Sequence, residues 1–248
     1  MTLQDQINAI AARQGATHVE DLLLTARVVD YSSAGGGSGE TYRVELESGT
    51  VAFHKTFAGV PVSLAGDYGH EDPDQVPIQE AAAWRLAEAL GSPVSDLVCV
   101  CVLRTIYDEP GTLSLLVPGQ PWHGGEDTNA LSVVADQASA GAFFDSLIAQ
   151  QDRHNGNLFY DGATLGLIDH GFTFALPGDC LNAGNLAEWR REHGDPTLTT
   201  WERDALDRLL HTDLLGMRAI LHPRRAAALA DRAQRMRTTS EILRPGAF

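Results

Sequence analysis

Three polar residues near the middle of the chain have the types and spacing needed for phosphoryl transfer from ATP. Asp152 is followed five positions later by Asn157, and Asp169 follows twelve positions after that. A carboxylate such as Asp152 can orient an attacking hydroxyl or accept its proton, whereas Asn157 and Asp169 offer oxygen ligands that suit Mg²⁺. Short apolar runs on either side of Asp161-Gly162 predict a β-hairpin that folds these two ligands back together. The alternative is a polar helix end followed by an unrelated hairpin.

A glycine-rich segment upstream has the composition of a phosphate-binding loop. The run Gly35, Gly36, Gly37, Ser38 and Gly39 separates two apolar stretches. Glycines allow backbone N–H groups to approach phosphate oxygens closely. The run matches neither a Walker A loop nor a GxGxxG loop, and a slack hairpin has the same composition. Both a cofactor-binding loop and a plain hairpin therefore remain open.

Lys55 is the basic residue expected to meet the phosphates of ATP. It lies between apolar residues of an expected strand, where burying an unpaired ammonium group would be costly. Glu80, in the first turn of an expected helix, is the natural partner, and Glu88 on the same helix is a weaker one. A lysine on an edge strand that points to water is the alternative, and the helix dipole alone would also favour a glutamate at position 80.

The elements that must position these residues fall into two parts. Residues 1–117 and 118–248 are expected to form separate lobes, with a connector at 118–126. In the first part we expect strands at 22–32, 40–47, 50–57, 94–106 and 111–117, helices at 3–14 and 78–90, and a loop at 59–77. In the second we expect helices at 138–151, 200–210 and 223–237 and short strands at 158–160 and 165–168. The class is α+β, with an N-terminal antiparallel β-lobe carrying one inserted helix and a mainly helical C-terminal lobe.

Composition restricts the partners. The formal net charge of −15 disfavours nucleic acid and anionic membrane surfaces. No stretch approaches the length of a membrane span, and the N-terminus lacks a secretion signal. Cys99 and Cys101 alternate within an apolar run and Cys180 stands apart, so we expect buried, reduced thiols and no zinc site. These features favour a cytoplasmic protein.

Two segments resemble a known family. Residues 152–158, Asp-Arg-His-Asn-Gly-Asn-Leu, and residues 167–172, Leu-Ile-Asp-His-Gly-Phe, are similar to the Asp-Arg-His-x-x-Asn and Ile-Asp-Phe-Gly signatures of the phosphatidylinositol 3-/4-kinase superfamily. The resemblance implies a two-lobed protein-kinase-like fold and dependence on ATP and Mg²⁺, with Mn²⁺ as a possible substitute. It also implies a set of roles: Asp152 as the catalytic residue, His154 as an assisting residue, and Asn157 and Asp169 as metal ligands.

Other roles are implied by position more than by motif. Lys55 corresponds to the lysine that binds the phosphates, Glu80 to its helix partner, and Leu116 and Val117 to the hinge that binds adenine. From its chemistry alone, His154 could contact a phosphate or acceptor oxygen or could brace its loop. Arg153 is expected to be a structural ion-pair partner.

The chain also departs from the family pattern. His170 replaces the usual Phe, for which the sequence offers no reason, and the segment after Gly171 lacks the basic cluster that lipid kinases use. We therefore expect a kinase acting on a hydroxyl of a protein, a peptide or a small metabolite. A catalytically inert pseudokinase that regulates a partner, an AMP-transferring enzyme and a true inositol-lipid kinase remain as alternatives.

Overall fold

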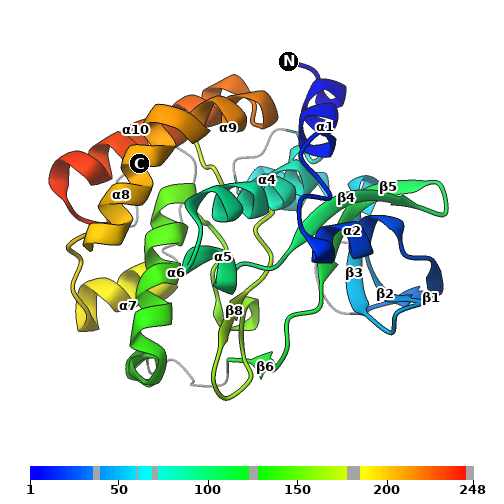
Figure 1. Cartoon of the computed structure of the whole chain (residues 1–248), viewed down its shortest axis with the longest axis horizontal. Helices are drawn as coiled ribbons and strands as arrows, with labels where there is room; N and C mark the ends of the chain where they lie inside the picture. The colour runs from blue at the N-terminus through cyan, green and yellow to red at the C-terminus, as the bar shows by residue number, and fades with distance from the viewer. Residues whose placement is uncertain (36–39, 60, 69–71, 123–127, 178–184, 244–248) are drawn as a thin grey trace.

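The protein is described from a computed structural model, in which residues 1–35, 40–59, 61–68, 72–122, 128–177 and 185–243 are described. A sheet forms one side of the molecule and helices form the other (Figure 1). Among the described helices, none has both the length and the apolar composition needed to cross a membrane.

The sheet has five antiparallel strands in the order β1-β2-β3-β5-β4. Their bounds are β1 Val28–Ser33, β2 Thr41–Leu46, β3 Val51–Thr56, β4 Cys101–Ile106 and β5 Glu109–Leu115. One face packs on helix α2 (His18–Thr25) through an apolar cluster that includes Leu23, Val44 and Leu113. In β3, Ala52, His54 and Thr56 are buried and alternate with the half-buried Phe53 and Lys55. Lys55 therefore lies on the face opposite the cluster beneath α2.

Helix α4 (Gln75–Leu90) crosses the middle of the molecule and contacts both the sheet and the helical part (Figure 1). Around it lie α1 (Leu3–Ala11), α3 (Val62–Asp67) and α5 (Val94–Leu97), and the helical part contains α6 (Ala135–Ile148), α7 (Asn185–His193), α8 (Thr200–Arg208), α9 (Leu214–Ile220) and α10 (Pro223–Thr239). Short helical turns at Phe57–Gly59, Thr128–Val134, Asn155–Asn157 and Leu209–Asp213 complete the helices. A small sheet joins β6 (Gln120–Pro121), β7 (Leu158–Tyr160) and β8 (Leu165–Leu167).

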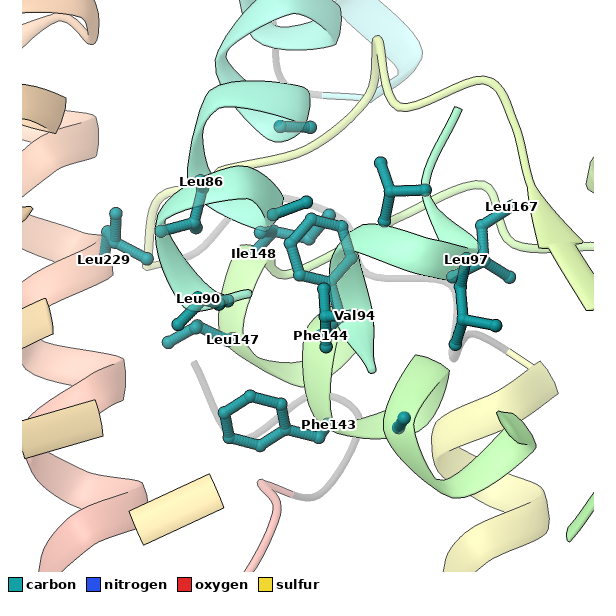
Figure 2. Close-up of a cluster of buried hydrophobic side chains, with 14 of the residues drawn as sticks. Leu86, Leu90, Val94, Leu97, Phe143, Phe144, Leu147, Ile148, Leu167 and Leu229 are labelled. Atoms are coloured by element: carbon teal, nitrogen blue, oxygen red, sulfur yellow. The ribbon is translucent and has the colours of Figure 1, made fainter. Parts of the chain in front are cut away.

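The main core fixes α4 to the helical part. Figure 2 shows that α4, α5, α6, β8 and α10 all contribute side chains to it: Leu86, Leu90, Val94, Leu97, Phe143, Phe144, Leu147, Ile148, Leu167 and Leu229. Each is at most 4% exposed, so this interface is as closed as a domain interior. The predicted α+β arrangement of a β-lobe and a helical lobe is confirmed, whereas the exact boundary at 117/118 stays a prediction.

Three local predictions were wrong. The strand expected at 22–32 begins only at Val28, because the preceding residues form α2. The strand expected at 94–106 begins at Cys101, because residues 94–97 form α5. The loop expected at 59–77 contains α3 and the first residues of α4. As a result Glu80 lies in the second turn of its helix, beyond the first turn in which the helix dipole favours a carboxylate.

Candidate active site

A cavity of about 650 Å³ lies where the sheet, α4 and the segments 152–157 and 168–172 meet. Every predicted site residue that the structure describes lines it: Gly35, Lys55, Glu80, Leu116, Val117, Asp152, His154, Asn157 and Asp169. The remaining predicted ones, Gly36, Gly37, Ser38 and Gly39, lie outside the described residues. Residues that are far apart in the sequence are therefore brought to a single cavity.

Lys55 bridges the two parts of the molecule. Its Nζ lies 2.8 Å from Asp169 Oδ1 and 3.6 Å from Glu80 Oε2. Burial opposes a charge on this lysine, but the carboxylates of Asp169 and Glu80 outweigh that effect and raise its pKa above the ordinary value. Burial likewise opposes ionisation of Glu80, but Lys55 and His170 together outweigh it and hold the pKa of Glu80 below its usual range. The predicted lysine–glutamate pair is present, and Asp169 shares it.

Asp169 is held in an uncommon backbone conformation. Its φ is 56°, in the left-handed region that residues other than glycine seldom adopt. Gln150 Nε2 donates to the carbonyl oxygen of Asp169 at 3.0 Å and helps to stabilise this conformation. Such conformations persist only where surrounding contacts enforce them, and they cluster at functional sites.

Arg153 holds the segments on either side of the site together. Its guanidinium donates to both carboxylate oxygens of Asp145, on α6, at 2.9 and 3.0 Å. It also donates to the carbonyl oxygens of Asn157, at 2.9 Å, and Ile168, at 2.7 Å. The Asp145 and Arg153 side chains are at most 1% exposed. The structural ion-pair role expected for Arg153 is confirmed, and the group ties the loop of Asp152 to the segment that leads into Asp169.

His170 belongs to the same network, which explains a residue that the sequence left unexplained. Its Nε2 lies 3.0 Å from Arg153 Nη2, and its Nδ1 lies 3.9 Å from Glu80 Oε1. A guanidinium can only donate, so Nε2 accepts and the proton of the neutral ring sits on Nδ1, facing Glu80. Burial lowers the pKa of His170 more than Glu80 raises it, so the ring is neutral near pH 7.

Asn157 and Asp169 have donor atoms suited to a divalent cation. The hairpin of β7 and β8 pairs Leu158 with Leu167, which places Asn157 beside the strand end that precedes Asp169. Asn157 Nδ2 donates to the carbonyl oxygen of Asp152 at 2.8 Å, which leaves Oδ1 as the acceptor atom of the amide. Within the described part of the chain no group of three or more His, Cys, Asp or Glu could hold a metal. Mg²⁺ and Mn²⁺ fit such a sparse oxygen site when phosphates and waters complete the coordination.

The loop between Asp152 and Asn157 is braced by His154, whose Nδ1 accepts from the Gly156 N–H at 3.0 Å. Its other ring nitrogen makes no hydrogen bond to the described residues and is available for a ligand or for water. Tyr68, which no sequence pattern marks, donates its hydroxyl proton to Asp152 Oδ1 at 2.9 Å. Asp145 and Gln150 were likewise not predicted, because each acts through tertiary contacts that no local motif marks.

The predicted hinge runs along the cavity after β5. The Leu116 N–H donates to Val51 O at 3.0 Å, and the Cys99 N–H donates to Leu167 O at 3.0 Å, so the neighbouring segments are tied together there. Cys99 and Cys101 are buried free thiols, as expected, and burial raises the pKa of both. Cys180 lies outside the described residues.

Comparisons with known proteins agree with this architecture. No protein-family model matches the sequence, and a search of curated proteins found no match either. A crystal structure of the Golgi casein kinase superposes with a TM-score of 0.57 at 12% identity, covering 87% of this chain and 72% of that one. The same kinase with Mn/ADP bound gives 0.57 at 13% identity, covering 87% and 73%. A looser match, with a TM-score of 0.47 at 13% identity, is the Helicobacter pylori proinflammatory kinase CtkA, covering 89% and 94%.

Identities this low establish the fold alone. The resemblance to phosphatidylinositol 3-/4-kinases in particular stays a prediction, because the two Golgi casein kinase structures match the protein-kinase-like architecture in general. The chain has a two-lobed protein-kinase-like fold, with its candidate site in the cavity between the sheet and the helical lobe.

Proposed function

We propose that the protein is a kinase that transfers the γ-phosphate of ATP, with a divalent cation, to a hydroxyl of a protein, a peptide or a small metabolite. The observation that supports this most is the convergence of Lys55, Asp152, Asn157 and Asp169 on one cavity. Phosphoryl transfer depends mainly on holding the triphosphate, neutralising its charge and placing the acceptor in line, and these are the groups needed for those tasks.

The apolar part of the cavity suits an adenine base. Its lining includes Phe53, Leu115, Leu116, Val117, Phe159 and Ile168. A flat aromatic ligand gains most from such a slot, while the hydrogen-bonding edge of the base is left for backbone groups. The Golgi casein kinase, which has a similar fold, was crystallised with Mn/ADP bound. This supports a nucleotide and a divalent cation as ligands of this fold.

The charge of the cavity supports a requirement for metal. Apart from His154 and the Cys99 thiol, whose pKa is raised by burial, its ionisable lining among the described residues is one lysine, Lys55, and three carboxylates, Glu80, Asp152 and Asp169. A triphosphate brought here without a cation would face net repulsion at short range. A divalent ion held by Asn157 and Asp169 would supply the missing positive charge and bind the phosphate oxygens.

In this proposal each side chain has a separate task. Asp152 orients the acceptor hydroxyl and takes its proton as the new bond to phosphorus forms. Lys55 binds phosphate oxygens and is itself positioned by Glu80. Arg153 and Gln150 do not meet the substrate, but hold the backbone of Asn157 and Asp169 in place. When bound, the metal supplies charge neutralisation of the triphosphate.

The test is incubation with labelled ATP and Mg²⁺ or Mn²⁺, followed by intact-mass analysis of the protein and of candidate acceptors. Asp152→Ala should abolish labelling, whereas Asp30→Ala, which removes an exposed carboxylate on β1, should not. The proposal fails if wild-type protein neither hydrolyses ATP nor transfers phosphate. Thermal stabilisation by ATP without turnover would point to a pseudokinase, and a mass gain of AMP would point to the AMP-transferring alternative.

A further inference from the structure

One hydroxyl of the chain already occupies the position that a substrate hydroxyl would need. Tyr68 directly follows α3 and donates its phenolic proton to Asp152 Oδ1 at 2.9 Å. This is the contact that the proposed mechanism requires between an acceptor and the carboxylate that takes its proton.

Contacts at three points hold Tyr68 there. Its hydroxyl meets Asp152, its ring stacks on Phe172 with centroids 4.3 Å apart and planes 20° apart, and its carbonyl oxygen accepts from Gln151 Nε2 at 3.0 Å. Gln151 precedes Asp152, and Phe172 follows Asp169 by three residues. The position of the tyrosine is therefore set by the same two segments that carry the candidate catalytic and metal-binding groups.

Tyr68 also belongs to a small apolar cluster. It packs against Ala65, Val76 and Phe172, which are buried beside the cavity. Burial of an aromatic ring in such a cluster stabilises the docked segment, so the hydroxyl contact does not depend on one hydrogen bond alone.

The other tyrosines are engaged elsewhere. Tyr31 contacts His54 and stacks on Tyr42, and Tyr160 donates to Gly162 O at 2.7 Å. Tyr107 is 67% exposed, in the turn between β4 and β5, and its ring contacts Tyr31. Among the five tyrosines of the chain, all within the described residues, Tyr68 alone contacts a carboxylate of the candidate site.

We propose that Tyr68 is an intramolecular phosphate acceptor, so that the protein phosphorylates its own tyrosine. This inference rests on the proposed kinase function. The Tyr68 oxygen forms a bond to the γ-phosphorus, the bond from that phosphorus to the bridging oxygen breaks, and ADP leaves with the electron pair. The phenolic proton passes to Asp152 and then to solvent, and ATP is the only co-reactant.

The product cannot keep the present contact. Phosphotyrosine carries up to two negative charges at neutral pH and would face the carboxylates of Asp152 and Asp169. Electrostatic repulsion then removes Tyr68 from Asp152 and leaves that position open for an external hydroxyl. Self-phosphorylation would in this way relieve a block that the unmodified tyrosine imposes on the acceptor position.

The experiment uses the full chain, treated first with a phosphatase and then with ATP and Mg²⁺ or Mn²⁺, with the modified residue located by peptide mass spectrometry. Phosphate is expected on Tyr68. Tyr68→Phe, which keeps the stacked ring, should lose it completely, and the matched control Tyr107→Phe should retain it. The labelled fraction per unit time should not change over a roughly hundredfold dilution, because the step is intramolecular.

A second measurement needs neither nucleotide nor metal. Tyr68→Phe removes only the hydroxyl contact, so amide hydrogen exchange in residues 61–68 should become faster than in wild type, and Tyr107→Phe should leave it unchanged. Equal exchange in wild type and Tyr68→Phe would overturn the docked position.

The outcomes separate the two proposals. Wild-type protein that consumes ATP or labels another hydroxyl while Tyr68 stays unmodified overturns this inference and leaves the kinase function standing. Labelling of Tyr68 that slows on dilution overturns the intramolecular route. Protein that neither binds nor consumes ATP removes the function on which the inference rests.

Discussion

Replacing Asp145 by Asn tests whether the buried ion pair beneath the candidate site determines its order. The carboxylate accepts two hydrogen bonds from Arg153, and both side chains are at most 1% exposed. The amide of Asn keeps the size but removes the charge, and it turns one acceptor into a donor that faces the guanidinium. Breaking one side of a buried pair typically costs about 3–5 kcal/mol, because a charge is left without compensation. We expect a loss of unfolding free energy in this range.

The chain provides a matched control in Arg237 and Asp207. This pair has the same two-point geometry, with distances of 2.7 and 3.0 Å, but its side chains are 38% and 42% exposed. Solvent screens the pair, so Asp207→Asn should change stability little. Urea unfolding measures the unfolding free energy of both variants, provided that its dependence on urea concentration, the m-value, is the same for each. If Asp145→Asn costs no more than Asp207→Asn, burial does not govern the strength of the pair and the reasoning is refuted.

The same variant should also impair ligand binding, because Arg153 holds the carbonyl oxygens of Asn157 and Ile168. Calorimetric titration of folded Asp145→Asn with Mg-ATP should show weaker binding than in Asp207→Asn. Unchanged affinity would mean that the metal-binding segment keeps its shape without this pair.

Three further predictions concern the sheet and its neighbours. Lys55→Met should lower the affinity for Mg-ATP by about tenfold or more in a calorimetric titration, since it removes the only lysine among the described residues of the cavity; unchanged affinity would contradict the phosphate-binding role. Gly111→Ala should cost about 1–3 kcal/mol in chemical unfolding, because its Cβ would lie 2.3 Å from Lys55 O, whereas Gly66→Ala, with open space around it, should be tolerated. Burial lowers the pKa of His54 and His170 in the folded protein. Near and below the ordinary pKa of 6.5 the unfolded chain therefore binds more protons than the folded protein, and the unfolding free energy should fall as the pH drops through that value. The slope should be at most about 1.4 kcal/mol per pH unit for each histidine, and His54→Gln should reduce it in thermal unfolding experiments.

The part of the site that the sequence predicted best is local. Asn157 binds the backbone of Asp152 five residues away, and the hairpin that returns the chain to Asp169 has two short strands and a turn. Contacts between residues so close in the sequence can be predicted from their spacing. The contact of Lys55 with Asp169 spans 114 residues and was not predicted; the expected partner of Lys55 was Glu80, and the family resemblance implied only that both residues serve one site.

The contacts of Tyr68 and Asp145 could not be foreseen in this way. Tyr68 lies in a stretch that reads as a polar loop, and its contact with Asp152 spans 84 residues. Asp145 is one of several polar residues on a mainly apolar helix, and nothing local marks it as the partner of Arg153. Such pairs are set by the packing of whole elements, which the local pattern of one sequence does not encode.

Helix α2 is a different case, because the sequence contains a helix-start signal, although the residues that follow it favour a strand. Apolar and β-branched residues after position 21 favoured a strand, yet Thr17 and Glu20 form a capping box with hydrogen bonds of 3.1 and 3.2 Å. Glu20 also accepts from Trp84 Nε1 at 2.9 Å, so the start of α2 is anchored on α4. The local cap and the tertiary contact together stabilise a helix, although the following residues favour a strand. The strand forms only from Val28 onward.

The arrangement around Lys55 indicates how the site would respond to its ligands. Lys55 now makes its shorter contact with Asp169, and Glu80 Oε2 is buried without a hydrogen bond in the part of the chain that the structure describes. A cation on Asp169 would repel the ammonium group, which would then gain more from Glu80 and from phosphate oxygens. That oxygen of Glu80 is already in ion-pair contact with Lys55, at 3.6 Å from Nζ, so it can take over as the closer partner. Binding of the metal alone would cost Lys55 its ion pair with Asp169. Binding of the metal and the triphosphate together would replace that ion pair with contacts to phosphate oxygens. Each ligand should therefore increase the affinity for the other.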